Sequence, residues 1–300
     1  MPKSGLGGRR GEYLTLLHPG PSAICTAVTV TAGWSVHNRL PSGGPPPPGW
    51  KARLAWAGAA MALAQVSTGV VNDAYDAPWD RQFQPYKPIA QGSVPRAHAW
   101  VIGGVSGAAS MLLAARAGPS ALRLMALGLG SGWAYSLGLS RTPFSFVPFA
   151  TGLATVPLLG PAAVGASLPA QAQVTVLAAA LGVGLHLANG GPDIARDRLS
   201  GRRSLPVLLG EEGSRALSQL VLGLGSVAVA LGSPARGRRW AWAGAAGCAA
   251  LVLWDRVLPP PDRSQGGHPF VRPALAGGIL AVGWLAARAG GEQARRRSVA

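Results

Sequence analysis

Apolar stretches long enough to cross a membrane recur along nearly the whole chain. A transmembrane helix needs about 20 mainly apolar residues, and we identify nine such stretches: 14–36, 53–71, 97–115, 120–139, 144–160, 168–189, 214–232, 239–258 and 272–289. The fifth is short, and we expect Pro148 and Pro157 to break its helix. Charged residues make up only 13% of the chain, against roughly one quarter in soluble domains. The pattern predicts an all-α polytopic membrane protein of about nine transmembrane helices, forming a single domain over residues 1–300.

Glycine and alanine fill these stretches where leucine would be usual, and the chain contains 43 glycines. Helices in lipid associate through close backbone approach, which small residues permit. We therefore expect the helices to meet at small side chains.

The chain is strongly basic, with a formal net charge of +16. In a soluble protein this charge would suggest binding to nucleic acid. Here the basic residues lie between the apolar stretches, so anionic membrane lipids and a phosphorylated substrate are the expected partners, and nucleic acid is not. The connection after the sixth stretch is rich in arginine, which favours a cytoplasmic location for it. We expect an integral protein of a bacterial cell membrane.

Acidic residues are scarce, and several gather at two points. The chain has 11 Asp and Glu residues in all. Asp73, Asp76 and Asp80 follow the second stretch, and Asp193 and Asp197 follow the sixth. Four crossings separate the two points, so they face the same side of the membrane whichever way the chain inserts. We therefore expect one pocket, facing the cytoplasm, to use both.

The spacing of these acids suits a cation site. On a helix Asp73, Asp76 and Asp80 fall within a sector of roughly 60°, and Asp193 and Asp197 also share a face. Clustered carboxylates repel one another unless a cation neutralises them. Oxygen ligands without nearby Cys or His favour Mg²⁺ over zinc or copper. For any single aspartate, helix capping or pairing with a loop arginine remains an equally good interpretation.

Neighbouring residues complete this hypothesis. Gly190, Gly191 and Pro192 are expected to interrupt the sixth helix, with Pro192 opening a short new one. The histidines near the ends of the stretches, His18 among them, are not expected to form a ligand set. His186, inside the sixth stretch, is expected to be neutral and hydrogen-bonded. The basic candidates for binding phosphate oxygens are Lys87, Arg141, Arg202 and Arg203.

Three segments resemble the UbiA superfamily of intramembrane prenyltransferases. Asn72-Asp73-x-x-Asp76-x-x-x-Asp80, followed by the segment 85–92 (PYKPIAQG), is similar to the first signature of that family. Asp193-x-x-x-Asp197, followed by the segment 201–206 (GRRSLP), is similar to the second. The segment from Tyr135 to Arg141 resembles the fourth-helix segment of the family.

The resemblance implies nine helices around a central cavity and a Mg²⁺-dependent enzyme. Such an enzyme moves a prenyl group from a prenyl diphosphate to a small-molecule or lipid acceptor, which the sequence does not identify. Carried over, the metal ligands would be Asp73, Asp76, Asp80, Asp193 and Asp197. Asp73, Asp76, Asp193, Asp197 and Tyr135 would be catalytic, with Tyr135 facing the carbocation. The substrate-binding residues would be Asn72, Lys87, Arg141, Asn189, Arg202 and Arg203.

This sequence departs from the family pattern at three positions. Lys87 stands where arginine is frequent, Ser140 where many members carry lysine, and Asn189 where some members carry an acid. Two alternatives stay open. One is a terpene cyclase of the same fold, in which the prenyl chain captures its own cation. The other is a transporter of an anionic solute, a class in which repeated halves and broken helices are common.

Overall fold

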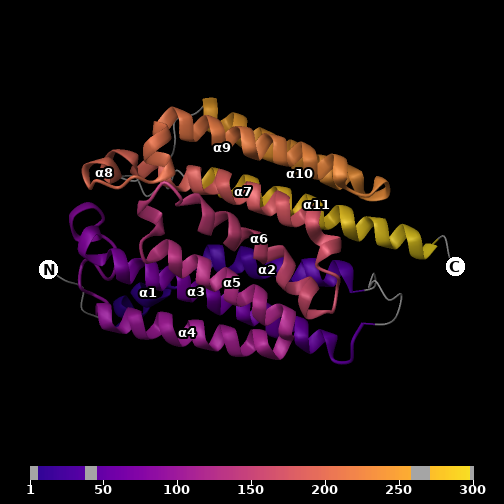
Figure 1. The fold of residues 1–300 in the computed structure, drawn as a ribbon, viewed down its shortest axis with the longest axis horizontal. Helices are drawn as coiled ribbons and strands as arrows, with labels where there is room; N and C mark the ends of the chain where they lie inside the picture. Colours follow the sequence, from indigo (N-terminus) through magenta and orange to yellow (C-terminus); the bar gives the residue numbers. More distant parts are fainter. Residues whose placement is uncertain (1–5, 38–45, 258–270, 298–300) are drawn as a thin grey trace. The chain divides into compact units, whose positions relative to one another are not determined.

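Helices make up all the regular structure of the residues that the structure describes, which are 6–37, 46–257 and 271–297 of a computed structural model (Figure 1). Five helical stretches within these ranges are long and apolar enough to cross a membrane. They are α3 (Trp50–Phe83), α4 (Arg96–Ala117), α6 (Phe146–Ala163), the stretch Pro169–Leu199 and α9 (Leu205–Gly232). The protein is therefore an all-helical integral membrane protein.

The expected count of about nine spans is not confirmed. Four further helices lie in the expected stretches but do not combine the same length and hydropathy. These are α2 (Pro19–Val36), α5 (Pro119–Ser136), α10 (Arg238–Val257) and α11 (Val271–Arg297). Arginines in the sequences of α10 and α11 lower their mean hydropathy.

Contacts within the chain define two compact units, and each is described by itself. Unit 1 comprises the described residues of 1–140 and 155–168, and unit 2 those of 141–154 and 169–300. Unit 1 holds α1 (Leu6–Leu16), α2 to α5 and the second half of α6. Unit 2 holds the first half of α6, α7 (Ala172–Gly190), α8 (Ile194–Leu199) and α9 to α11. Each unit thus carries one aspartate motif.

In unit 1 the helices meet at small residues, as expected. A Cβ atom added at Gly160 of α6 would clash with the carbonyl oxygen of Thr29 in α2. Helices α3 and α4 lie side by side (Figure 1), and Ser67 Oγ donates to the Gly103 carbonyl at 2.7 Å. The same hydroxyl accepts the indole N–H of Trp133 in α5 at 3.0 Å. Close packing therefore fixes the part of α3 around Ser67, which precedes the first motif.

Unit 2 is packed in the same way. A Cβ at Gly244 of α10 would lie 2.9 Å from the Cα of Gly283 in α11. Ser145 Oγ lies 2.9 Å from Nε2 of the buried His186 and accepts the Leu205 N–H at 3.0 Å. The expectation of a hydrogen-bonded His186 is confirmed. This contact ties α7 to the start of α9, on either side of the second motif.

The prolines in α6 do not interrupt the helix, contrary to the expectation. The helix runs unbroken from Phe146 to Ala163 with Pro157 and Pro161 inside it, so the expected break at Pro148 and Pro157 is wrong. Pro148 lies in the first turn, where backbone N–H groups have no helical partner to lose. An interior proline removes one helical hydrogen bond, which membrane helices tolerate where neighbouring groups compensate.

The first expected stretch, 14–36, is divided. Helix α1 ends at Leu16, and α2 begins only at Pro19. Between them His18 adopts the left-handed conformation, with φ 46° and ψ 58°. Proline at the first helical position has no N–H to leave unpaired and a φ angle already suited to a helix. The division matters because it sets the position of the His18 side chain.

Candidate active site

The first aspartate motif lies on α3, which continues through it to Phe83. Residues seven apart on a helix lie two turns apart on nearly one face, so Asp73 and Asp80 point the same way. Both are buried, with exposed fractions of 6% and 2%. Two buried carboxylates on one face need positive partners, because an unpaired buried charge is costly.

Lys87 supplies that positive charge. Its Nζ lies 3.1 Å from Oδ1 of Asp73 and 2.9 Å from Oδ2 of Asp80. Burial acts to lower the pKa of Lys87, but the charges of Asp73 and Asp80 outweigh it and raise the pKa above its ordinary value. The ammonium is therefore held between the two carboxylates in its charged form. Lys87, predicted as a substrate-binding residue, lies beside two of the predicted metal ligands.

His18 is a member of this cluster that the sequence reasoning missed. Its Nε2 lies 2.9 Å from Oδ2 of Asp73, the oxygen that Lys87 does not contact. Gly69, one turn before Asp73, makes room for the ring: a Cβ there would lie 2.5 Å from Cδ2 of His18. The expectation for His18 concerned only a ligand set of histidines, so this contact with Asp73 was not predicted. A partner 55 residues away leaves no periodic signal in the sequence.

Arg96 is a second partner that the sequence did not reveal. Pro78 lies inside α3 and has no N–H to donate to the Ala74 carbonyl four residues earlier. Arg96, the first residue of α4, donates its Nε–H to that carbonyl at 2.7 Å. The freed backbone group is thereby paired, and α3 continues to Asp80. Proline within the motif is tolerated because α4 supplies this donor.

The other predicted residues of unit 1 lie on α3 and α5. Asn72 and Asp76 are partly buried on α3, and Tyr135 is partly buried in the last turn of α5. Their assigned roles stay predictions.

The second motif follows a break in the helix, as expected. Helix α7 ends at Gly190, a short 3₁₀ turn runs Gly191–Asp193, and α8 covers Ile194–Leu199. Pro192 lies in the first turn of the new segment, where proline is favoured. This confirms the predicted interruption and brings Asp193 and Asp197 to successive turns.

Arginines pair with both aspartates of this motif. Arg196 Nη2 lies 3.0 Å from Oδ2 of Asp193, and its Nε lies 3.7 Å from Oδ1 of Asp197. Arg202 Nη1 lies 3.6 Å from the same Asp197 oxygen. Arg202 was a predicted site residue, whereas Arg196 was expected only as part of the basic connection. Its position three residues after Asp193 was the available signal.

The chain also brings the remaining basic candidates of unit 2 together. The Arg203 N–H donates to the Arg141 carbonyl at 3.0 Å, and the Arg202 N–H donates to the Asp197 carbonyl at the same distance. Arg203 is exposed, and Arg141 is partly buried. Asn189 is partly buried in the last turn of α7. Unit 2 therefore groups carboxylates and guanidinium groups in a way that suits a polyanion with its counter-ions.

The donor chemistry of both motifs fits Mg²⁺. In unit 1 the oxygens of Asp73 and Asp80 already converge on one positive group, and in unit 2 Asp193 and Asp197 share Arg196. Within the described ranges, no three Asp, Glu, His or Cys side chains are close enough to hold a metal by themselves. Mg²⁺ typically uses one or two carboxylates and completes its shell with water and substrate phosphate. The residues present suit that mode of binding.

Comparison with known proteins identifies similar sequences. Residues 26–266 match the UbiA prenyltransferase family. Over 185 residues, 60% of this chain, the sequence is 31% identical to digeranylgeranylglyceryl phosphate synthase of Natronomonas pharaonis, and the match spans 64% of that relative's length.

Solved structures agree in fold. A UbiA homolog from Archaeoglobus fulgidus bound to DMAPP and Mg²⁺ superposes with a TM-score of 0.69 at 16% identity, covering 94% of this chain and 99% of its own. The apo structure of a UbiA homolog from Aeropyrum pernix K1 gives 0.66 at 18% identity, covering 89% and 96%. Together with the match over residues 26–266, this similarity shows that the chain belongs to the UbiA prenyltransferase family.

Proposed function

We propose that this protein is a membrane prenyltransferase that binds a prenyl diphosphate together with Mg²⁺ and transfers the prenyl group to an acceptor. The observation that carries the proposal is the convergence of two buried carboxylates, Asp73 and Asp80, on a single positive group. Family membership supports it, as does the relative from Archaeoglobus fulgidus, whose structure holds DMAPP and Mg²⁺.

Acidic side chains are proposed to bind the metal, and basic and amide side chains to bind the diphosphate. The proposed Mg²⁺ ligands are Asp73, Asp76, Asp80, Asp193 and Asp197. When bound, Mg²⁺ neutralises diphosphate oxygens and so makes the diphosphate a better leaving group. The groups proposed to contact the diphosphate directly are Asn72, Lys87, Arg141, Asn189, Arg202 and Arg203. Basic side chains near the departing oxygens stabilise the negative charge that develops there.

The reaction balances without a redox partner. The allylic C–O bond breaks, and its electron pair leaves with the diphosphate. A bond forms between the allylic carbon and the acceptor, and the acceptor loses a proton. Tyr135 is proposed to face the carbocation with its ring, whose face attracts positive charge. Apolar helix walls exclude water, which would otherwise capture the cation.

We propose a glyceryl phosphate lipid as the first acceptor to test. The support is the name of the relative in Natronomonas pharaonis, a digeranylgeranylglyceryl phosphate synthase that is 31% identical over 185 residues. An acceptor dissolved in the membrane also suits a site built on membrane helices.

We further propose that the two units act as one catalytic domain with both motifs facing the cytoplasm. The arginine-rich connection after α7 supports this orientation. Leu199 at the end of α8 is 82% exposed, so a cysteine placed there, in a protein lacking Cys25 and Cys248, reports the orientation. An impermeant thiol reagent should label it in inverted vesicles. Labelling from outside intact cells would contradict the orientation.

The test of function uses purified protein in detergent with Mg²⁺, labelled DMAPP or GPP, and a panel of acceptors that includes a glyceryl phosphate lipid. We expect release of diphosphate and a product whose mass is that of the acceptor plus one prenyl group. Diphosphate release with only a prenyl hydrocarbon as product would indicate a cyclase. Absence of diphosphate release across the panel, from folded protein, would contradict the proposal.

A further inference from the structure

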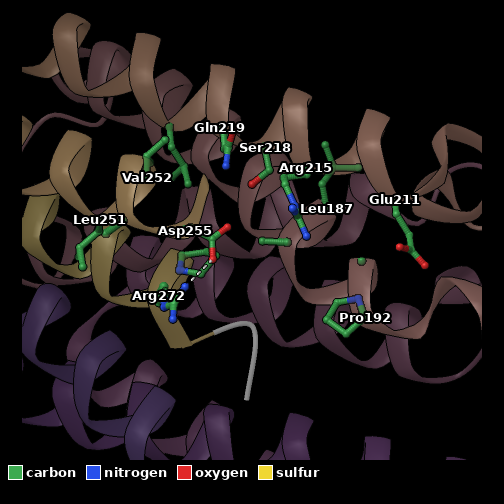
Figure 2. A pocket seen from close by; sticks show the side chains of 15 residues that line it. Leu187, Pro192, Glu211, Arg215, Ser218, Gln219, Leu251, Val252, Asp255 and Arg272 are labelled. Atoms are coloured by element: carbon green, nitrogen blue, oxygen red, sulfur yellow. Dashed lines mark ion pairs between the residues drawn. The ribbon is translucent and has the colours of Figure 1, made fainter. Parts of the chain in front are cut away.

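A cavity of about 180 Å³ lies within unit 2 and has no role in the reaction proposed above (Figure 2). It is formed where the end of α7, the first part of α9, the end of α10 and the start of α11 meet. Gly191 and Pro192 belong to its wall, but neither Asp193 nor Asp197 does. The cavity therefore lies next to the second motif and is lined by different side chains.

One face of α9 supplies the polar part of the wall. Glu211, Arg215 and Gln219 all line the cavity and are four residues apart, so successive side chains lie about 6 Å apart along the helix axis. Figure 2 shows Arg215 between Glu211 and Gln219. Glu211 and Arg215 are exposed, whereas Gln219 is partly buried. The wall thus carries charged side chains on two turns of α9 and an amide on the next.

Gln219 is the residue that points to a ligand. Its Nε2 is buried and has no hydrogen-bond partner among the residues that the structure describes. A buried donor without a partner is destabilising, and more so where the surroundings are apolar. A ligand oxygen in the cavity would give this donor its acceptor.

The cavity wall carries two acids and two arginines, and the donors that face an oxygen group are Arg215 and Gln219. The carboxylate of Asp255 is offset by Arg272, whose Nη1 lies 3.8 Å from Oδ1 (Figure 2). Glu211 lies one turn of α9 before Arg215. Arg215, which is exposed, and Gln219, which is partly buried, follow on the next two turns, and both side chains donate hydrogen bonds. Guanidinium and amide N–H groups on adjacent turns suit the oxygens of a phosphate.

Apolar side chains make up the rest of the wall. Leu187, Leu222, Leu251 and Val252 line the cavity beside the donors. Its volume is below the roughly 300 Å³ at which pockets for drug-sized molecules begin, so it has room for a head group while an attached chain lies outside. A phosphate next to apolar side chains in a membrane helix bundle is the chemistry of a lipid.

We propose that this cavity binds the phosphate head group of an amphiphile, with phosphate oxygens accepting hydrogen bonds from Arg215 and Gln219. The ligand could come from two sources with this shared chemistry: a bilayer phospholipid or a single-chain lipid phosphate. The proposal concerns binding alone and needs no prenyl transfer, so it stands or falls separately from the proposed function.

The experiment measures binding by titration calorimetry to the purified full chain in a neutral detergent, without prenyl diphosphate. The probes are lysophosphatidic acid, a short-chain phosphatidylglycerol and inorganic phosphate. We expect Arg215→Gln and Gln219→Leu each to weaken lipid binding about tenfold, since each removes a donor to an anion. The matched control is Arg256→Gln, an exposed arginine next to Asp255 that does not line the cavity. Its affinity should change less than twofold.

Gln219→Leu should fold well, because it removes an unpartnered buried amide; its melting temperature is the check. Gln219→Glu, which puts a carboxylate against the phosphate, should weaken binding further. Tighter binding of phosphatidylglycerol assigns the site to a bilayer lipid, and tighter binding of lysophosphatidic acid assigns it to a single-chain lipid phosphate. Equal affinities in the wild type and both variants, or inorganic phosphate binding as tightly as the lipids, would overturn the proposal.

Discussion

The two aspartate motifs are built in different ways, although both place carboxylates against cations. In unit 1 the acids lie on one unbroken helix, where the buried Asp73 and Asp80 contact Lys87 just beyond the helix, and Asp73 also contacts His18, 55 residues away. In unit 2 the acids lie on a broken helix and pair with arginines of the same short segment, Arg196 and Arg202. The side chain of Asp193 is 20% exposed, against 8% for that of Asp73.

This difference concerns how each site is held in place. Buried ion pairs with partners on other elements fix a side chain, and removing one partner leaves a costly charge behind. The second motif is also partly buried, with side-chain exposures of 11% for Asp197 and 10% for Arg202, but its pairs join residues of one short segment and not separate helices. We infer that contacts with the connection between α1 and α2 and with the loop after α3 hold the first motif in place, whereas contacts within its own segment hold the second.

The largest effect is expected from Asp80→Ala. The change removes one of the two carboxylates that contact Lys87. The same carboxylate is a proposed metal ligand. Turnover should fall about 10²-fold or more, as when a group that stabilises developing charge is removed. Steady-state kinetics with protein amounts normalised would measure it. Glu212→Ala, an exposed carboxylate on α9, is the matched control and should keep near-normal turnover. Equal turnover in the two variants would show that the first motif takes no part in the reaction.

Arg96→Ala tests the long-range support of the first motif. It leaves the Ala74 carbonyl without its donor, which should cost about 1–3 kcal/mol in the free energy of unfolding. In a Pro78→Ala background the helix regains its own N–H donor, so the same change should cost much less. A double-mutant cycle of unfolding free energies measures this coupling. Equal costs in both backgrounds would mean that Arg96 does not compensate for the proline.

Gly69→Ala tests whether His18 positions Asp73. The new methyl group would displace the His18 ring and separate it from the carboxylate, so we expect about a tenfold loss of kcat, as for His18→Ala; a positioned hydrogen bond commonly contributes 1–2 kcal/mol. In a His18→Ala background, Gly69→Ala should add almost nothing. Gly104→Ala, on α4 where an added Cβ meets nothing within 4 Å, is the control. Additive losses in the double variant would show that Gly69 acts by another route.

The smallest effect on stability is expected from Arg196→Gln. Its pairs lie on one segment, and Asp197 keeps Arg202 as a partner, so the unfolding free energy should fall by only about 1 kcal/mol. Thermal unfolding of the purified protein measures this. A loss as large as that of Arg96→Ala would mean that the second motif is as tightly built as the first.

Sequence alone predicted what depends on local spacing. The shared face of Asp73 and Asp80 followed from helical periodicity, and the break at Gly190 to Pro192 followed from the backbone preferences of glycine and proline. Small residues at helix contacts were also predictable, because lipid leaves close packing as the main force between helices.

Sequence could not predict what depends on distant partners. Nothing in the spacing links His18 to Asp73 or Arg96 to Ala74, because tertiary packing sets these contacts. The failed prediction of a break in α6 has a related cause: the effect of a proline depends on its place in the helix and on what surrounds the carbonyl it frees. The count of about nine spans is not confirmed among the described residues, and for α10 and α11 arginines lower the mean hydropathy.

The central claim is that both motifs act on one diphosphate. Its most direct test is the turnover of Asp73→Ala, Asp193→Ala and the double variant, at normalised protein amounts. If the motifs work as one unit, each single change should nearly abolish turnover, and the double variant should be little worse than either, because residues that act together are strongly non-additive. Near-normal turnover in Asp193→Ala, or losses that multiply in the double variant, would contradict it.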